Sequence, residues 1–241
     1  MTENRTTPPA PPVVDRATWL REREALLVRE KEHTRAGDAI AAARRRLPMT
    51  EVTPLSLPGA NGPTPLVDMF EGRDELVVYK HMWEEGKPIA QQCEGCTITI
   101  WDFQNAAYLN ARGVTFAVWC PGPQEELTRF REFMGYTHPW YSTRGVDDPA
   151  YAGGGAIAVF LRRGDRVFLT YETTGRGVEA IMASLKLLDM TVYGRMETWE
   201  DSPKDWPQSP TFHFWRTEGR PTAQWTRPGA TPVDSSDGGC H

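Results

Sequence analysis

The sequence has few cysteines, no long apolar run and no strong excess of charge of either sign. Only four cysteines occur in 241 residues, too few for a scaffold held together by disulfides. No apolar run approaches the roughly 18 residues that a membrane-spanning helix needs. Residues 1–12 are polar and proline-rich, without the apolar stretch of a secretory signal. A formal net charge of −5 gives no electrostatic case for nucleic-acid binding. We therefore expect a cytoplasmic protein that binds neither nucleic acid nor membrane.

Composition and patterning divide the chain into four regions. We expect a disordered arm at residues 1–14 and an N-terminal helical extension with a short hairpin at 15–65. A folded domain is expected at 66–198 and an extended tail at 199–241. Asp15 is a suitable N-cap for the first helix, and Gly37 is expected to split that helix in two. The tail is rich in proline and tryptophan, which predicts docking onto the domain or onto a second subunit. A homodimer formed through the terminal extensions is therefore one expected assembly.

Two of the cysteines stand in an informative context. Residues 76–83 form an apolar, β-rich run that predicts a buried strand, and residues 97–112 contain neither glycine nor proline and predict a helix. Cys93 and Cys96 lie between them as a Cys-x-x-Cys pair that opens the helix. A strand, a loop and a Cys-x-x-Cys at a helix start are typical of a redox-active dithiol.

This arrangement assigns a chemical role to each thiol. The free N–H groups at the start of a helix stabilise a thiolate, so Cys93 is predicted to be the nucleophile and Cys96 the resolving thiol. Glu94 is expected to raise the pKa of Cys93, because a negative charge opposes the formation of a thiolate. Asp102 is a candidate proton acceptor for Cys96, although a solvated helix aspartate is the simpler explanation.

The remaining elements complete a recognisable order. We expect a strand at 114–120, a helix at 124–134 that Gly135 closes, a hairpin at 156–171 and a last helix at 177–188. Two parallel strands joined by a helical crossover, then an antiparallel pair and a closing helix, resemble a thioredoxin-like fold. The predicted class is therefore α/β, a central mixed sheet flanked by helices, with N-terminal helical and C-terminal Trp/Pro-rich extensions.

Several blocks between Trp19 and Glu197 resemble the DUF899 family, which is grouped with thioredoxin-like proteins. These blocks are residues 19–20 with 26–32, 45–49, 66–72, 134–136 with 139–142, 167–171, 176–177, and 188–189 with 194–197. The resemblance implies a Cys-x-x-Cys after the first strand, which Cys93 and Cys96 match, and an Asp on the same helix, which Asp102 matches. The family's Ser-Arg-Ala after the second strand is replaced here by residues 120–122, so the chain resembles a diverged member.

Two other interpretations compete with a thiol-disulfide oxidoreductase. In the first, His81 and Cys120 join the Cys-x-x-Cys thiols to bind copper or zinc, whereas a packed histidine and a core cysteine are the simpler explanation. Thioredoxins carry a cis-proline opposite the thiols, but residues 152–155 contain no proline, which favours the metal-binding interpretation slightly. In the second, the chain is a non-catalytic interaction module.

The redox interpretation requires no cofactor, and its expected partner is a protein or small-molecule thiol or disulfide. Trp83, Trp140 and Tyr141 are candidates for the walls of a substrate pocket, and a loop anchored by its aromatic side chains is the alternative for the last two.

Overall fold

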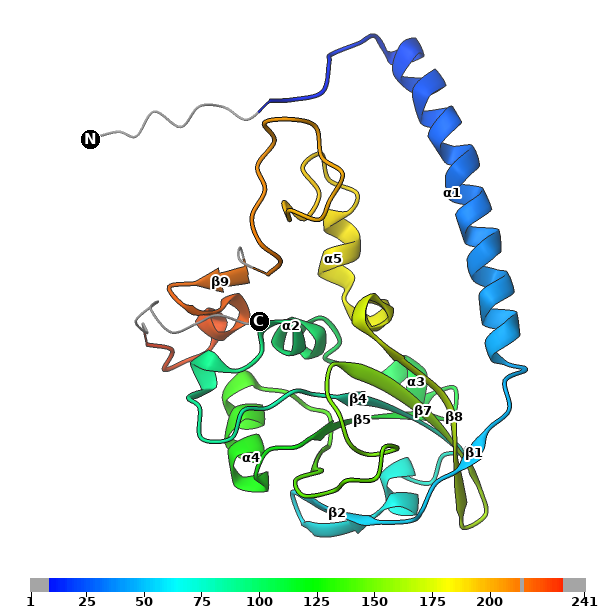
Figure 1. Ribbon diagram of the computed structural model, residues 1–241, viewed down its shortest axis with the longest axis vertical. Helices are drawn as coiled ribbons and strands as arrows, with labels where there is room; N and C mark the ends of the chain where they lie inside the picture. Colours follow the sequence, from blue (N-terminus) through cyan, green and yellow to red (C-terminus); the bar gives the residue numbers. More distant parts are fainter. Residues whose placement is uncertain (1–8, 213–214, 232–241) are drawn as a thin grey trace. The chain divides into compact units, whose positions relative to one another are not determined.

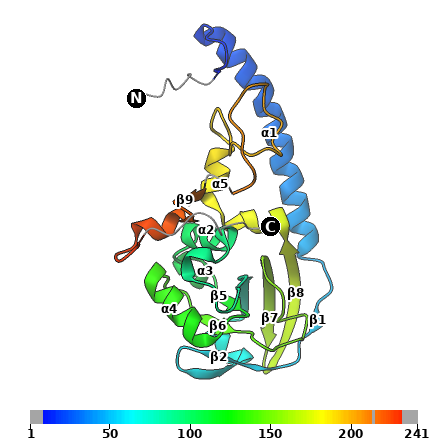
Figure 2. The ribbon, with the colours of Figure 1, turned by 60° about the vertical axis from the view of Figure 1, so that its left-hand side comes forward.

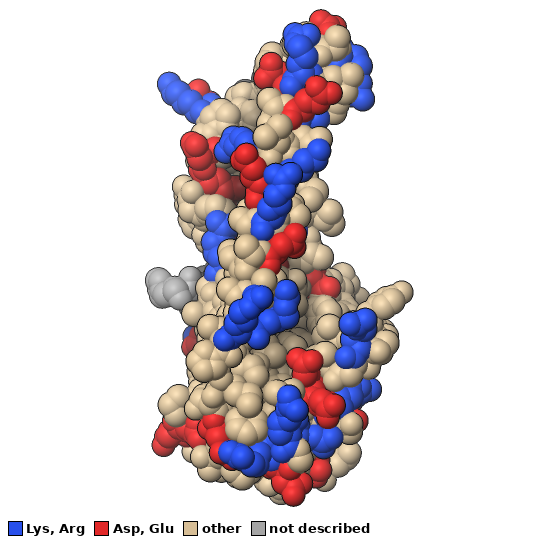
Figure 3. All heavy atoms as spheres, turned by 90° about the vertical axis from the view of Figure 1, so that its right-hand side faces the viewer, with Lys and Arg blue, Asp and Glu red and all other residues tan. Residues whose placement is uncertain are grey.

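The structure is a computed structural model that describes residues 9–212 and 215–231. The chain forms two compact units. Among the described residues, one comprises 9–48 with 201–207, and the other 49–200 with 208–212 and 215–231. Within the described ranges, no helix combines the length and apolar character that crossing a membrane requires. Basic and acidic side chains are interspersed over the face of the molecule that Figure 3 shows.

The first unit contains one long helix, α1 (Arg16–Arg44). Asp15 caps it as predicted, because its carboxylate accepts a hydrogen bond of 2.8 Å from the backbone N–H of Thr18. The predicted break at Gly37 is wrong: the helix continues through this exposed position. A single glycine costs about 1 kcal/mol relative to alanine, which the other 28 of the 29 residues can offset.

The second unit is built on a six-stranded mixed sheet (Figures 1 and 2). In spatial order its strands are β1 (Thr50–Glu51), β8 (Arg166–Thr174), β7 (Ala156–Arg163), β4 (Glu75–Lys80), β5 (Val114–Cys120) and β6 (Trp140–Ser142). Strands β4, β5 and β6 are parallel, whereas β7 is antiparallel to β4, and β8 to β7. The order β8-β7-β4-β5, with these directions, is that of a thioredoxin-like fold, which confirms the predicted class.

The helices connect and flank this sheet. They are α2 (Glu94–Asp102), α3 (Ala107–Asn110), α4 (Gln124–Met134) and α5 (Ala183–Leu188). The predicted helix over 97–112 therefore begins earlier and is broken at residues 103–106. The last predicted helix is a 3₁₀ helix, Gly175–Ile181, followed by α5. Two small hairpins complete the unit: β2 (Ser56–Gly59) with β3 (Gly62–Pro65), and β9 (Arg216–Thr217) with β10 (Arg220–Pro221).

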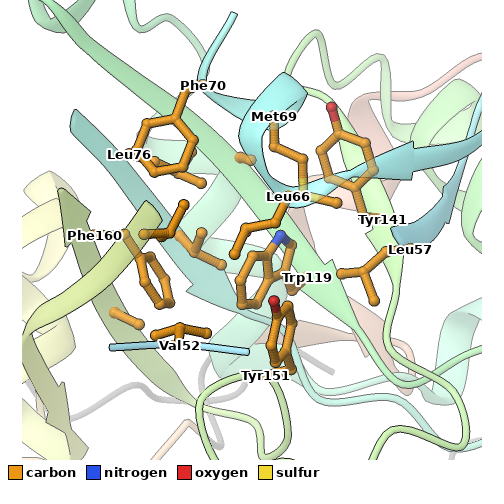
Figure 4. Close-up of a cluster of buried hydrophobic side chains, with 14 residues drawn as sticks. Val52, Leu57, Leu66, Met69, Phe70, Leu76, Trp119, Tyr141, Tyr151 and Phe160 are labelled. Carbon is orange, nitrogen blue, oxygen red and sulfur yellow. The ribbon is translucent and has the colours of Figure 1, made fainter. Parts of the chain in front are cut away.

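Strand alternation divides the core into two layers, because successive side chains point to opposite faces of a sheet. One cluster contains Trp119 stacked on Tyr151, with ring centroids 4.9 Å apart (Figure 4). The other cluster contains Tyr79, Cys96 and Cys120. Tyr79 thus belongs to the core cluster into which the first turn of α2 inserts Cys96.

Candidate redox site

The Cys-x-x-Cys pair opens helix α2, as predicted. Cys93 is the N-cap residue, and its carbonyl oxygen accepts hydrogen bonds from the N–H and hydroxyl groups of Thr97. The Cys93 side chain is half-buried, whereas Cys96, one helical turn further on, is 1% exposed. Cys93 is therefore the thiol that a substrate reaches more easily, and Cys96 faces the core.

Hydrogen-bond donors converge on the buried thiol. The Tyr79 hydroxyl donates to Cys96 Sγ over 3.1 Å, and the Met82 backbone N–H donates over 3.3 Å. Burial alone would raise the pKa of Cys96, but hydrogen bonds from Cys93, Tyr79 and Met82 outweigh burial and lower it. Burial and the neighbouring Cys96 charge raise the pKa of Tyr79 well above its usual value, so Tyr79 keeps its proton and remains a donor.

Of the two residues between the thiols, Glu94 is the charged one, and a cation lies near it. Glu94 is 2% exposed, and its carboxylate lies 3.9 Å from Nε of Arg216. The same guanidinium donates to the carbonyl oxygens of Ala90 and Gln92, over 3.0 and 2.9 Å. From the sequence alone, the negative charge of Glu94 is expected to raise the pKa of Cys93. The structure supplies a cation that reduces its effect on the thiols.

His81 and Cys120 lie next to each other in the core. Both side chains are fully buried, and Cys120 Sγ is 3.9 Å from His81 Nδ1. His81 Nδ1 also contacts the Met82 carbonyl oxygen, which requires the ring proton to be on Nδ1. Burial lowers the pKa of His81 to about 4 and raises that of Cys120 to about 12. Among the described residues, no three Cys, His, Asp or Glu side chains are arranged to hold one metal ion.

The Asp102 carboxylate accepts hydrogen bonds from another helix, α5. Its two carboxylate oxygens accept hydrogen bonds of 2.7 Å from the backbone N–H and the hydroxyl of Ser184, in the first turn of α5. This is the geometry of a helix cap supplied from a neighbouring element. These contacts anchor α5 to α2 through Asp102, and its role as a proton acceptor for Cys96 stays a prediction.

The aromatic residues expected in a pocket wall lie elsewhere. Trp140 is 2% and Tyr141 8% exposed, and both belong to the hydrophobic core. Trp83 packs against Gly122, and its indole N–H donates to Glu126 over 2.8 Å. None of the three lines the cavity beside the thiols, because the loop that carries Trp140 and Tyr141 forms strand β6 instead.

A cavity of about 520 Å³ opens beside both thiols. Its floor includes Tyr79, Met82, Cys93 and Cys96. Its walls come from residues 175–185 and from the C-terminal part of the chain, which contributes Arg195, Glu197, Trp199, Thr211 and Phe212. The sequence did not indicate this cavity, because its two halves are distant along the chain.

Gly155 occupies the position where thioredoxins have their cis-proline, directly before β7, and it lines the cavity. The adjacent Gly154 lies against Met82: a Cβ atom there would come within 2.6 Å of Met82 Cγ. Small residues at this point therefore allow the chain to pass close to the segment that donates a hydrogen bond to Cys96.

The family model with the description "Bacterial protein of unknown function (DUF899)" matches residues 8–218. The match spans most of the chain and shows that the protein belongs to this family. Among curated proteins there is no match.

Solved structures give distant similarities. A Bacteroides thetaiotaomicron protein assigned as a disulfide isomerase is 15% identical, covers 60% of this chain and 92% of its own, and has a TM-score of 0.41. Peroxidoxin BcpB from Mycobacterium tuberculosis is 16% identical, covers 58% of this chain and 97% of its own, and has a TM-score of 0.40. Apo Sco1 from Thermus thermophilus is 17% identical, covers 59% of this chain and 93% of its own, and has a TM-score of 0.37. The fold assignment itself rests on the strand order and directions given above.

Proposed function

We propose that the protein is a cytoplasmic thiol-disulfide oxidoreductase in which Cys93 attacks and Cys96 resolves. One observation carries the proposal: both thiols border one cavity, and the buried thiol has two hydrogen-bond donors, Tyr79 and Met82, aimed at its sulfur. A purely structural cysteine pair has no need for stabilisation of its thiolate form, whereas thiol-disulfide exchange proceeds through thiolates.

The geometry suggests how the proton moves. In the reduced pair the Cys93 thiol donates a hydrogen bond to the Cys96 sulfur, which lowers the pKa of Cys96 and favours its thiolate. As Cys93 Sγ attacks one sulfur of a disulfide, its proton passes to the Cys96 thiolate, the substrate S–S bond breaks, and one half leaves as a thiolate. The Cys96 proton then passes to that thiolate, directly or through water. Cys96 Sγ attacks Cys93 Sγ, which forms the intramolecular disulfide and expels the second half of the substrate. The substrate gains two electrons, and a thiol reductant restores the pair.

Copper or zinc binding by Cys93, Cys96, His81 and Cys120 is the alternative. Its support is the distance of 3.9 Å between His81 Nδ1 and Cys120 Sγ. Since His81 Nδ1 is engaged with the Met82 carbonyl, Nε2 is the nitrogen that would bind a metal. A non-catalytic module that dimerises through the terminal extensions is the third proposal, and truncation before Trp199 would abolish its dimer.

The deciding experiment is a thiol count before and after mild reduction, combined with elemental analysis of protein purified without chelator. We expect two additional thiols on reduction of wild type and of a Cys120→Ala control. Neither Cys93→Ser nor Cys96→Ser should show this gain. About one metal ion per chain, lost when either residue of the pair is changed, would overturn the redox proposal. The absence of both the thiol gain and the metal would favour the non-catalytic module.

A further inference from the structure

The C-terminal part of the chain covers the redox pair. We call residues 208–212 and 215–227 the covering segment. Its Phe212 ring lies on the backbone between the two thiols: a Cβ atom at Gly95 would be 3.2 Å from Phe212 Cε2. Phe212 also lines the cavity that Cys93 and Cys96 border. The surface that a Cys-x-x-Cys helix start would otherwise present is therefore occupied by the protein's own side chain.

Side chains of the covering segment attach it to the backbone around the thiols. Besides the two bonds from Arg216 to residues 90 and 92, Gln224 Nε2 donates to the Ile89 carbonyl oxygen and Arg227 Nε to that of Phe133, each over 3.0 Å. Arg216 additionally faces Glu94. The contacts with residues 89, 90 and 92 involve the connection that leads directly into Cys93, whereas Arg227 contacts the end of α4, so the segment is docked at the site.

Phe212 itself is held in a strained conformation. Its φ angle is +60°, a region that bulky side chains rarely occupy. The carboxylate of Glu197, a residue only 2% exposed, accepts hydrogen bonds from the Phe212 N–H over 2.9 Å and from the Trp199 indole N–H over 2.6 Å. Such strain persists only where surrounding contacts determine it, which indicates that the position of the ring matters.

The backbone opposite the thiols has little capacity to pair with a peptide. Gly155 N–H donates to the Lys80 carbonyl oxygen over 2.7 Å, and the Gly155 carbonyl oxygen accepts from the Thr174 hydroxyl over 3.0 Å. An extended polypeptide binds to such an edge through N–H and C=O groups that are still available. Here both groups already have partners within the domain.

The cavity has the dimensions and chemistry of a site for a small molecule. Its volume of about 520 Å³ falls within the usual range for such sites, and Val178, Met182, Leu185 and Phe212 give it apolar walls. We propose that the substrate is a small, apolar disulfide that enters this cavity, and that Phe212 excludes polypeptide disulfides. The proposal rests on the redox function proposed above: Cys93 attacks the small disulfide, and Cys96 completes the exchange.

The test compares reduction of 2,2′-dithiodipyridine, a small apolar disulfide, with reduction of insulin, a protein disulfide, by the full-length reduced protein. We expect wild type to reduce dithiodipyridine rapidly and insulin poorly. Phe212→Ala should accelerate insulin reduction by at least about tenfold, while the dithiodipyridine rate stays equal or falls. Trp225→Ala, which removes an aromatic ring of the covering segment that does not line the cavity, should change neither rate.

A second measurement needs no substitution at the site and so does not depend on the folding of a variant. Wild-type Cys93 should react with N-ethylmaleimide at least about ten times faster than with a maleimide on a large polyethylene glycol. Equal reaction rates, or insulin reduction by wild type as fast as by Phe212→Ala, would overturn the exclusion of polypeptides and leave the redox function standing. Failure of every variant to reduce either disulfide would overturn the redox function, and the inference with it.

Discussion

The hydroxyl group of Tyr79 lies 3.1 Å from Sγ of Cys96, although the two residues come from a central strand and from the helix that follows it. Tyr79 stays protonated because burial raises its pKa, so it can donate to a thiolate throughout the physiological pH range. A buried sulfur that accepts two hydrogen bonds is better suited to ionise than a buried sulfur in an apolar pocket.

Replacing Tyr79 with phenylalanine should raise the pKa of Cys96, because one donor to the thiolate is lost while burial remains. A charge-assisted hydrogen bond contributes about 1.5 kcal/mol, so closure of the disulfide should slow by about tenfold at neutral pH. Thiolate absorbance of a Cys93→Ser protein, titrated with and without Tyr79→Phe, measures the change. Tyr136→Phe is the matched control, since that hydroxyl donates to the Thr97 carbonyl oxygen. An unchanged titration curve would show that the contact does not stabilise the thiolate.

Asp102→Ala should destabilise the protein by about 1 kcal/mol, because α5 loses its cap. Ser184→Ala should have a smaller effect, since the backbone N–H of residue 184 still donates to Asp102. Urea denaturation of both single variants and the double variant gives the coupling between the two side chains. Strict additivity would argue against the contact between the Ser184 hydroxyl and Asp102, and an unchanged stability of Asp102→Ala would argue against the cap. A shift in the pH profile of disulfide closure in Asp102→Ala would instead support the proton-acceptor role that the sequence suggested.

The buried His81 should make stability depend on pH. Its pKa is lowered from about 6.5 in the unfolded chain to about 4 in the folded protein. Its neutral form therefore stabilises the fold above pH 6.5, and this contribution is lost as the pH falls toward 4. The loss amounts to at most about 3 kcal/mol. His81→Gln, which keeps a donor for the Met82 carbonyl, should flatten the dependence of the melting temperature on pH between 6.5 and 4. His33→Gln, on the exposed face of α1, should leave it unchanged.

Glu179, which pairs with Arg195, should make the stability of the fold depend on pH at more acidic values than His81 does. Hydrogen bonds from Arg195, Lys186 and Arg176 hold the pKa of Glu179 well below its usual value, with Arg195 the largest contributor. Ionised Glu179 therefore stabilises the fold above its ordinary pKa of about 4.3, and this stabilisation is lost as the pH falls further. Arg195→Met should cost about 3–5 kcal/mol at neutral pH, because it leaves the buried Glu179 carboxylate without its main partner. A loss below about 1 kcal/mol, measured by urea denaturation, would contradict this role.

Local signals in the sequence predicted several elements well. Strand β5 and helix α4 were predicted with their observed bounds, and Gly135 ends α4 with a positive φ angle of 71°. The strand, loop and Cys-x-x-Cys were also found in the predicted order. These features depend on nearest neighbours: β-branched runs, glycine at a helix end and cysteine spacing.

What the sequence could not predict depends on contacts between distant segments. Nothing near Tyr79 indicated that its hydroxyl would meet a thiol, although strand alternation could have placed it on that face once the helix was located. Phe212 reaches Gly95 from more than a hundred residues away. Trp140 and Tyr141 were predicted to line a pocket because aromatic loops often do, but here they form an additional parallel strand whose side chains fill the core.

The two residues between the thiols are both in contact with the covering segment: Glu94 faces Arg216, and Gly95 lies under Phe212. In the redox function proposed above, closing a disulfide between Cys93 and Cys96 would constrain the geometry of this helical turn. The free energy by which oxidation of the pair changes the docking of the covering segment must then equal the free energy by which docking changes the reduction of the pair. Docking of the segment would therefore shift the reduction potential. Changes to the Cys-x-x-Cys dipeptide, a common means of adjusting such potentials, therefore cannot be made in this protein without also altering how its C-terminal residues bind.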